Sequence, residues 1–322
     1  MKKSFIITID TEGDNLWKWK VGDVVRTENV KYLARFQTLA NTYGFKPVWL
    51  SNYEMIADDA YVEFAKTITK DNSGEIGMHL HAWNSPPLYE LPVAQNGAPY
   101  LIEYPEEVME EKIYYMTNFI TKRVGIQPVS HRAGRWAMND TYFSLLKKYG
   151  YKVDCSVTPH IDWRTSLGQT QGAKGTDYRH YPEEPYYIDE DKDLLEVPVT
   201  VRRIKKFYLP KRLTPRSIAG IVWRRINGQS LWIRPNGYNF HQMKDVIDRV
   251  VQSNSDYAMF MIHSSELMPG GSPTFPNEQS IEQLYNDLEK LFAYASQFFN
   301  GRTLAEYAKT KFHADGLMHE KK

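Results

Sequence analysis

The chain has 322 residues, of which 42% are hydrophobic and 25% are charged, so it is an ordinary globular sequence of one large domain or two small ones. Its net charge of +1 gives no global reason to expect a nucleic-acid partner. The single cysteine, Cys155, excludes an intramolecular disulfide, and no apolar stretch approaches the roughly 18 residues that span a bilayer. The start of the chain lacks the features of a signal peptide, so we expect a cytoplasmic protein.

The first predicted element is a buried strand formed by the apolar run from Phe5 to Ile9. The run stops at Asp10 and Glu12, whose side chains, two apart on a strand, point to the same face. Two carboxylates at the end of a buried strand require compensation by a metal, a proton or a cation. The alternative is that Asp10 caps a turn and Glu12 faces solvent.

Strand and helix patterns alternate along the rest of the chain. Strands are predicted at residues 46–50, 75–80, 128–131, 153–157, 194–201 and 257–262, and helices at 27–43, 59–69, 105–123, 140–148, 240–254, 278–299 and 302–311. Strands separated by helices imply parallel βαβ units, and about seven of them close into a barrel or near-barrel. We therefore predict one α/β domain over residues 1–313, with insertions at about 159–192 and 202–236, and a tail at 314–322.

A histidine pair ends the strand predicted at 75–80. His79 and His81 have strand spacing and therefore share a face. A lone histidine would be unremarkable, but two neutral imidazoles and one carboxylate make a common open metal site for hydrolysis. Glu12 or Asp10 supplies the carboxylate if the strands are neighbours.

Two further strand ends carry groups suited to catalysis. Arg132 follows the strand at 128–131, and a guanidinium there can hold and orient a carboxylate base. His263 follows the strand at 257–262, and an imidazole, which titrates near neutral pH, suits a general acid. An arginine that caps a helix and a buried structural histidine are the alternatives. Asp154 and Trp163 are weaker candidates, for a supporting carboxylate and a pocket wall.

One segment has an unusual charge distribution. From Val197 to Lys244 there is no Asp or Glu, while ten other positions carry Arg or Lys. The segment is either a solvated insertion or a surface for phosphates, which would allow peripheral contact with anionic lipid or with a phosphorylated carrier.

Taken in order, these motifs resemble the polysaccharide deacetylase family, the NodB-homology carbohydrate esterases. The strings HLHAW at 79–83, HRAGRW at 131–136 and HSSELMPG at 263–270 are similar to those of members from surface-polysaccharide and lipopolysaccharide biosynthesis clusters. The resemblance implies a distorted (β/α)7 barrel, one divalent metal, usually Zn²⁺, and hydrolysis of an N-acetyl or O-acetyl group on a sugar.

The resemblance also implies roles for individual residues. Asp10 matches the family's base, Arg132 the arginine that holds the base, and His263 the late acid. Glu12 and His79 match metal ligands.

This sequence departs from the family's pattern in two places. Thr11 separates two acids that are usually adjacent, and the second histidine, His81, follows at a spacing of two rather than four. Trp83 stands near the usual second position, so His81 is expected to replace that ligand. We expect Trp83, Arg135 and Trp136 to contact the substrate.

The sequence thus predicts a metal-dependent hydrolase that removes an N-acyl group, acetyl or formyl, from a sugar in surface-polysaccharide biosynthesis. The sugar is expected to be free or linked to phosphate or a lipid carrier. A glycan-binding barrel without catalysis and a hydrolase of a non-sugar amide or ureide are the alternatives.

Overall fold

The computed structural model describes residues 2–14, 16, 23–206, 208 and 228–316. Its main sheet has the strand order β10-β1-β2-β3-β4-β5-β7-β6, with β11 also paired to β1. All neighbours are parallel except β6, which is antiparallel to β7. The strands are β1 (Lys3–Thr11), β2 (Pro47–Ser51), β3 (Glu75–Leu80), β4 (Ser130–Ala133), β5 (Val153–Asp154), β6 (Tyr186–Tyr187), β7 (Leu195–Glu196), β10 (Tyr257–His263) and β11 (Phe299–Gly301).

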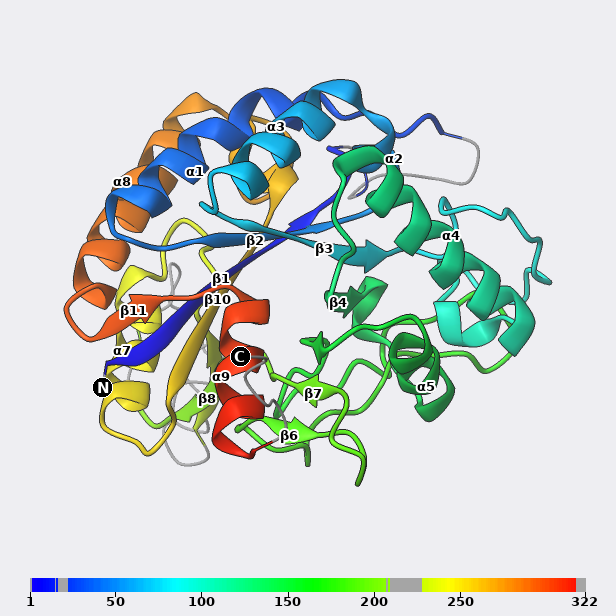
Figure 1. Ribbon diagram of the computed structural model, residues 1–322. Coiled ribbons are helices and arrows are strands. Elements are labelled where there is room, and N and C mark those ends of the chain that lie inside the picture. Colours follow the sequence, from blue (N-terminus) through cyan, green and yellow to red (C-terminus); the bar gives the residue numbers. More distant parts are fainter. Residues whose placement is uncertain (1, 15, 17–22, 207, 209–227, 317–322) are drawn as a thin grey trace, which may run out of the picture.

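Most of the helices cover the outer face of this curled sheet, whereas the last one, α9, packs on the hydrophobic cluster inside the curl (Figure 1). They are α1 (Leu33–Thr42), α2 (Tyr53–Ala57), α3 (Asp59–Lys70), α4 (Glu106–Val124), α5 (Asp140–Lys148), α7 (Phe240–Val251), α8 (Glu278–Ala295) and α9 (Leu304–Ala314). None of the helices in the described ranges is both long and apolar enough to cross a membrane.

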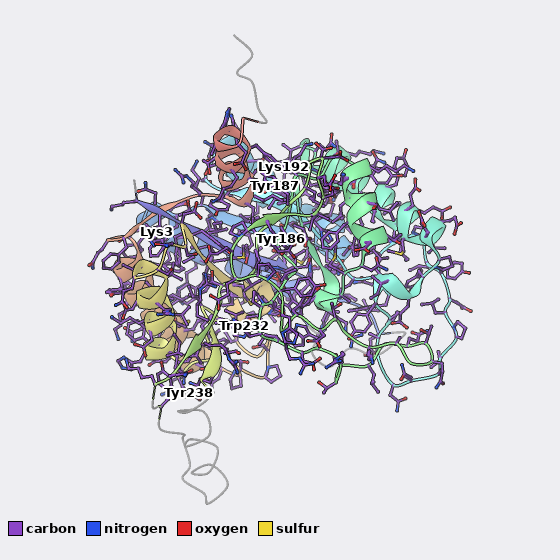
Figure 2. The ribbon with its side chains drawn as sticks, turned by 90° about the horizontal axis from the view of Figure 1, so that it is seen from below. Lys3, Tyr186, Tyr187, Lys192, Trp232 and Tyr238 are labelled. Atoms are coloured by element: carbon purple, nitrogen blue, oxygen red, sulfur yellow. The ribbon has the colours of Figure 1, made fainter. Side chains whose placement is uncertain are left out.

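The barrel is left open between β7 and β10. Several contacts bridge this gap: the Met259 N–H donates to Thr200 Oγ1 at 2.7 Å, the Tyr257 hydroxyl donates to the Pro198 carbonyl at 2.6 Å, and Ile233 forms an isolated bridge with Phe260. Beside the gap, β8 (Val201–Ile204) and β9 (Gln229–Trp232) form a separate antiparallel pair. In Figure 2, Trp232 lies within the outline of the molecule and Tyr238 near its lower margin. The predicted distorted (β/α) barrel is confirmed, in a half-open form.

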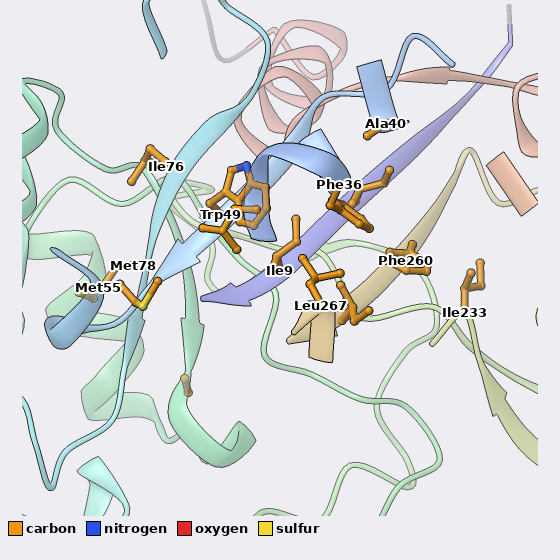
Figure 3. Packing of buried hydrophobic residues seen from close by; sticks show 14 of the residues in the cluster. Ile9, Phe36, Ala40, Trp49, Met55, Ile76, Met78, Ile233, Phe260 and Leu267 are labelled. Carbon is orange, nitrogen blue, oxygen red and sulfur yellow. The ribbon is translucent and has the colours of Figure 1, made fainter. Parts of the chain in front are cut away.

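Successive side chains of a strand point to opposite faces of the sheet, so the sheet has a separate hydrophobic cluster on each face. Phe5, Ile7 and Ile9 of β1 pack in the cluster beneath the helices, and Figure 3 shows Ile9 in this cluster with Phe36, Trp49 and Phe260. Ile6 belongs to a second cluster inside the sheet's curl, with Val48, Val153, Leu195 and Met259. The same alternation turns Thr8 and Asp10 toward the inside of the curl.

Most predicted elements are confirmed with small shifts at their ends, but two strands are wrong in extent. The expected strand 153–157 ends at Asp154, and the expected strand 194–201 divides into β7 and β8. After Asp154 the chain still runs alongside the segment that follows β7. Glu196 Oε1, however, accepts the Val157 N–H at 3.0 Å and so interrupts the regular ladder of backbone hydrogen bonds.

The helix predicted at 278–299 ends at Ala295, because Phe299 and its neighbours form β11 against β1. The helix predicted at 27–43 begins as a 3₁₀ turn at Glu28–Tyr32. Neither α2 nor β9 was predicted. In the insertion predicted at 202–236, residues 207 and 209–227 lie outside the described residues, as do residues 317–322 of the predicted tail.

Candidate active site

Four predicted site residues point inward from the carboxyl ends of neighbouring strands. Asp10 of β1 is the register partner of His263 of β10, and His79 of β3 is the register partner of Arg132 of β4. The parallel ladder therefore brings together residues that are up to about 250 positions apart in the sequence.

Glu12, His79 and His81 form a buried cluster whose ligand atoms lie within 4.8 Å of one another. Glu12 Oε2 is 2.8 Å from His81 Nε2 and 3.6 Å from His79 Nε2. Hydrogen bonds from His79 and His81 outweigh burial and hold the pKa of Glu12 well below its usual value. Two imidazoles and a carboxylate thus converge on one small volume.

The protonation pattern of the cluster fits a divalent cation. His79 Nδ1 lies 2.9 Å from the Arg132 carbonyl, an arrangement in which Nδ1–H donates and Nε2 keeps its lone pair. Burial lowers the pKa of His81 to about 4, so its imidazole is neutral at pH 7. Burial also opposes a charge on His79, but Asp10 and Glu12 raise its pKa, which shows the negative field that a cation would meet. Two nitrogens and one oxygen are a ligand set that Zn²⁺ accepts.

The loop after β4 approaches the cluster closely. A Cβ on Gly134 would lie 2.5 Å from the Leu80 carbonyl oxygen and 2.8 Å from His81 Nδ1, so only glycine fits there. Arg135 and Trp136 then adopt left-handed backbone conformations, with φ of 57° and 64°. This turn sets the Trp136 ring over the Arg132 guanidinium, with 5.0 Å between them.

Arg132 is fully buried and holds Asp10. Its Nη1 donates to Asp10 Oδ1 at 2.6 Å, its Nη2 to Thr8 Oγ1 at 3.0 Å and its Nε to the Cys155 carbonyl at 3.1 Å. Burial raises the pKa of Asp10, but Arg132 outweighs it, so the net pKa is lowered and the carboxylate is ionised. Its second oxygen, Oδ2, faces His263.

His263 stands between the two carboxylates of the first strand and a further pair of charged groups. Its Nε2 is 3.8 Å from both Asp10 Oδ2 and Glu12 Oε1. Its Nδ1 is 3.1 Å from Glu266 Oε2 and 3.1 Å from Arg234 Nη2. Glu266 also accepts the His263 backbone N–H at 3.0 Å, which fixes the carboxylate beside the ring.

A cavity of about 710 Å³ opens above these groups. Asp10, Glu12, His79, His81 and His263 line its floor. Trp83, Trp136 and Trp163 line its walls, and the Trp136 and Trp163 rings are nearly parallel, with centroids 6.3 Å apart and 7° between planes. Aromatic faces of this kind suit the apolar face of a sugar ring.

Arg135 reaches the same cavity, but its hydrogen bonds go to the protein. Its Nη1 donates to the Ala98 carbonyl, and its Nη2 donates to Ser166 Oγ and to the Leu167 carbonyl at 2.9 and 2.8 Å. Its guanidinium also lies 4.1 Å from the centroid of the Tyr100 ring. Arg135 therefore joins the two loops that form one wall of the cavity.

Asp154 does not line the cavity. Its Oδ2 lies 2.6 Å from His131 Nδ1, and the other nitrogen of that imidazole is 2.8 Å from the Tyr142 hydroxyl. Asp154 is thus part of a buried polar network behind Arg132.

Several residues that support the site were not singled out from the sequence. Asn52 Oδ1 accepts the His81 N–H at 3.2 Å, and Glu54 accepts both the Gly13 N–H at 2.7 Å and Asn84 Nδ2 at 2.8 Å. Glu54 thereby ties the loop that follows Glu12 to the loop that follows His81. Glu266 could have been found from the sequence, because it follows His263 by three residues, which is the spacing of a capping box.

No protein-family model matches the chain, and no curated protein matches it in sequence. Solved structures do share its fold. A Mycobacterium smegmatis protein assigned as a polysaccharide deacetylase aligns with a TM-score of 0.51 at 13% identity, over 99% of this chain and 93% of that one. An allantoinase aligns with a TM-score of 0.54 at 12% identity, over 98% and 91% of the two chains.

A third similar structure is a 4-alpha-glucanotransferase from Thermococcus litoralis. It aligns with a TM-score of 0.54 at 14% identity, over 96% of this chain and 40% of that one. The three proteins differ in the activities that they are named for, so these similarities establish the barrel fold and leave the chemistry to the site residues.

Proposed function

We propose that this protein is a metal-dependent hydrolase that removes an N-acyl group, acetyl or formyl, from a sugar in surface-polysaccharide or lipopolysaccharide biosynthesis. The observation that carries the proposal is the buried Glu12, His79 and His81 cluster beside the Asp10–Arg132 pair, beneath a tryptophan-lined cavity. The fold shared with the Mycobacterium smegmatis protein, which is assigned as a polysaccharide deacetylase, supports it.

Glu12, His79 and His81 would hold the ion, and Zn²⁺ suits this donor set. A divalent ion bound there supplies Lewis-acid polarisation of the acyl carbonyl and a more acidic water. Asp10 takes the proton from the attacking water through Oδ2, because Oδ1 already accepts from Arg132. His263 donates a proton from Nε2 to the departing nitrogen.

The balance of the reaction is simple. The water oxygen forms a bond to the acyl carbon, the carbon–nitrogen bond breaks, and the products are a carboxylic acid and the sugar's amine. Trp136 and Trp163 form a wall that excludes water and offers an aromatic face to the sugar ring.

The test is release of acetate or formate from N-acylated amino sugars by protein loaded with Zn²⁺, combined with metal analysis. We expect His79→Ala to lose the metal and turnover together, and Asp10→Asn to keep the metal while losing most turnover. His241→Ala, at an exposed position on α7, serves as the matched control. Turnover by the Asp10→Asn variant at the wild-type rate would remove its role as base.

Two other functions remain as outcomes of the same test. If the protein binds sugars but neither Zn²⁺ nor any N-acyl sugar is processed, the barrel is a glycan-binding module. The fold shared with an allantoinase supports a second candidate, a hydrolase of ureides or other non-sugar amides. Turnover of allantoin with no turnover of amino sugars would favour it.

A further inference from the structure

Two arginines, Arg135 and Arg234, line the cavity, and a third, Arg132, lies beneath its floor; their hydrogen bonds differ. Arg132 is fully buried beneath the floor, and its Nε, Nη1 and Nη2 all have partners. The terminal nitrogens of Arg135 are taken by the loops of the cavity wall. Neither arginine has an unengaged terminal nitrogen to offer a ligand.

Arg234 is different. It follows β9, lines the cavity, and its side chain is 27% exposed. Its Nη2 is 3.1 Å from His263 Nδ1 and 3.5 Å from both oxygens of Glu266. Within the described part of the chain, Nε and Nη1 make no hydrogen bond, so their hydrogens remain available to a bound molecule.

The ion pair of Arg234 with a carboxylate uses one nitrogen, Nη2. Asp10 is paired with Arg132 at 2.6 Å, and Glu12 belongs to the cluster with His79 and His81. Among the residues that the structure describes, Glu266 is the one carboxylate paired with Arg234, and it also accepts the His263 backbone N–H at 3.0 Å and faces His263 Nδ1 at 3.1 Å. A cation at the cavity wall, held at one nitrogen and open at the others, is suited to an oxyanion.

The position of Arg234 defines where that oxyanion would lie. Nε2 of His263 faces Asp10 and Glu12, whereas Nδ1, on the other side of the ring, faces Arg234. In the proposed reaction His263 protonates the departing nitrogen, so the group next to it is the sugar rather than the acyl chain. An anion on Arg234 therefore belongs to the sugar part of the substrate.

We propose that Arg234 binds an oxyanion, carboxylate or phosphate, carried by the sugar from which the acyl group is removed. This inference rests on the proposed function, and it assigns a charge to the substrate of the same site. Arg234 is also the one basic residue of the acid-free segment 197–244 that lines the cavity, among those that the structure describes. The other basic residues described there do not reach the catalytic floor.

The test measures binding separately from turnover. Calorimetry uses the Zn²⁺-loaded Asp10→Asn variant, which holds substrate without processing it, and three probes: N-acetylglucosamine, its 6-carboxylate and its 1-phosphate. We expect at least one anionic probe to bind tenfold or more tightly than the neutral sugar. Adding Arg234→Gln should remove that preference, whereas Arg203→Gln, at an exposed position on β8, should leave it intact.

The two anionic probes separate the sources of the charge: preference for the carboxylate indicates a uronic-acid sugar, and preference for the phosphate a sugar phosphate. Equal or undetectable binding of all three probes, or a preference that survives Arg234→Gln, overturns the inference. Turnover of neutral N-acyl sugars with no anion preference would overturn the role of Arg234 and leave the proposed function intact. An anion preference that depends on Arg234, in a protein that hydrolyses no amide, would instead overturn the proposed function.

Discussion

Arg132 Nη1 lies 2.6 Å from Asp10 Oδ1, and the two residues, 122 positions apart, are both buried inside the curl of the sheet. A guanidinium in this position has no access to solvent and depends on its carboxylate for compensation.

This pair predicts a clear stability effect. Arg132→Met leaves Asp10 buried without its cation, and we expect a loss of about 3–5 kcal/mol in the free energy of unfolding, measured by urea denaturation. The double variant Asp10→Asn/Arg132→Met removes both charges and should recover part of that loss. A double variant as unstable as the sum of the two single variants would show that the residues do not act as a pair.

His263→Ala should lower kcat by about 10²–10⁴ for an N-acyl sugar, because the departing amine must gain a proton to leave. A phenolate such as that of 4-nitrophenyl acetate leaves without this proton, so the variant should lose much less activity on that ester. Bound zinc should stay at the wild-type level. Equal losses on both substrates would mean that His263 acts in another way than as the acid.

We expect Glu196 to make the free energy of unfolding depend on pH. Burial, and then Asp154, its register partner, raise the pKa of Glu196 well above the ordinary 4.5. The native protein therefore keeps a proton on Glu196 that the unfolded chain releases above pH 4.5. The contribution of this residue to the free energy of unfolding is fully present below pH 4.5 and is lost as pH rises toward the native pKa. Glu196→Gln does not titrate, and its stability relative to the wild type should increase with pH, by at most about 1.4 kcal/mol per pH unit.

The measurement is urea denaturation of both proteins from pH 5 to pH 8, with Glu289→Gln on the exposed side of α8 as the control. Parallel curves for Glu196→Gln and the wild type would contradict the assignment.

Arg135→Lys should loosen one wall of the cavity. A lysine cannot reach the Ala98 carbonyl and the Ser166 and Leu167 oxygens together, as the guanidinium does. We expect faster hydrogen exchange in residues 94–100 and 163–170, and a higher KM with kcat little changed. If exchange stays at the wild-type rate while KM rises, Arg135 contacts the substrate directly.

Much of the site could be predicted from the sequence because strand geometry is local. Spacing of two on a strand fixes a shared face, so His79 and His81 could be paired, and the strand ends carrying Asp10, Arg132 and His263 could be assigned to one rim. The structure brings these residues together as expected, with 3.6 Å between Glu12 Oε2 and His79 Nε2.

What the sequence could not supply depends on contacts between distant segments. The strand expected at 153–157 is cut short by the Glu196 side chain, and β11 forms because Phe299 meets β1. Arg234 was one of many basic residues in its segment, and its position beside His263 follows from the bridge between Ile233 and Phe260. No local pattern encodes such a bridge.

The register pairs Asp10–His263 and His79–Arg132 have a consequence for how this scaffold could diversify. The spacing of the reacting groups is inherited from backbone pairing between strands, whereas the tryptophans at 136 and 163, and the arginines at 135 and 234, stand on connecting segments. Lengthening or replacing those segments would change which molecules are accepted while leaving the bond-breaking geometry untouched. Selection for a new substrate can therefore proceed without disturbing the chemistry.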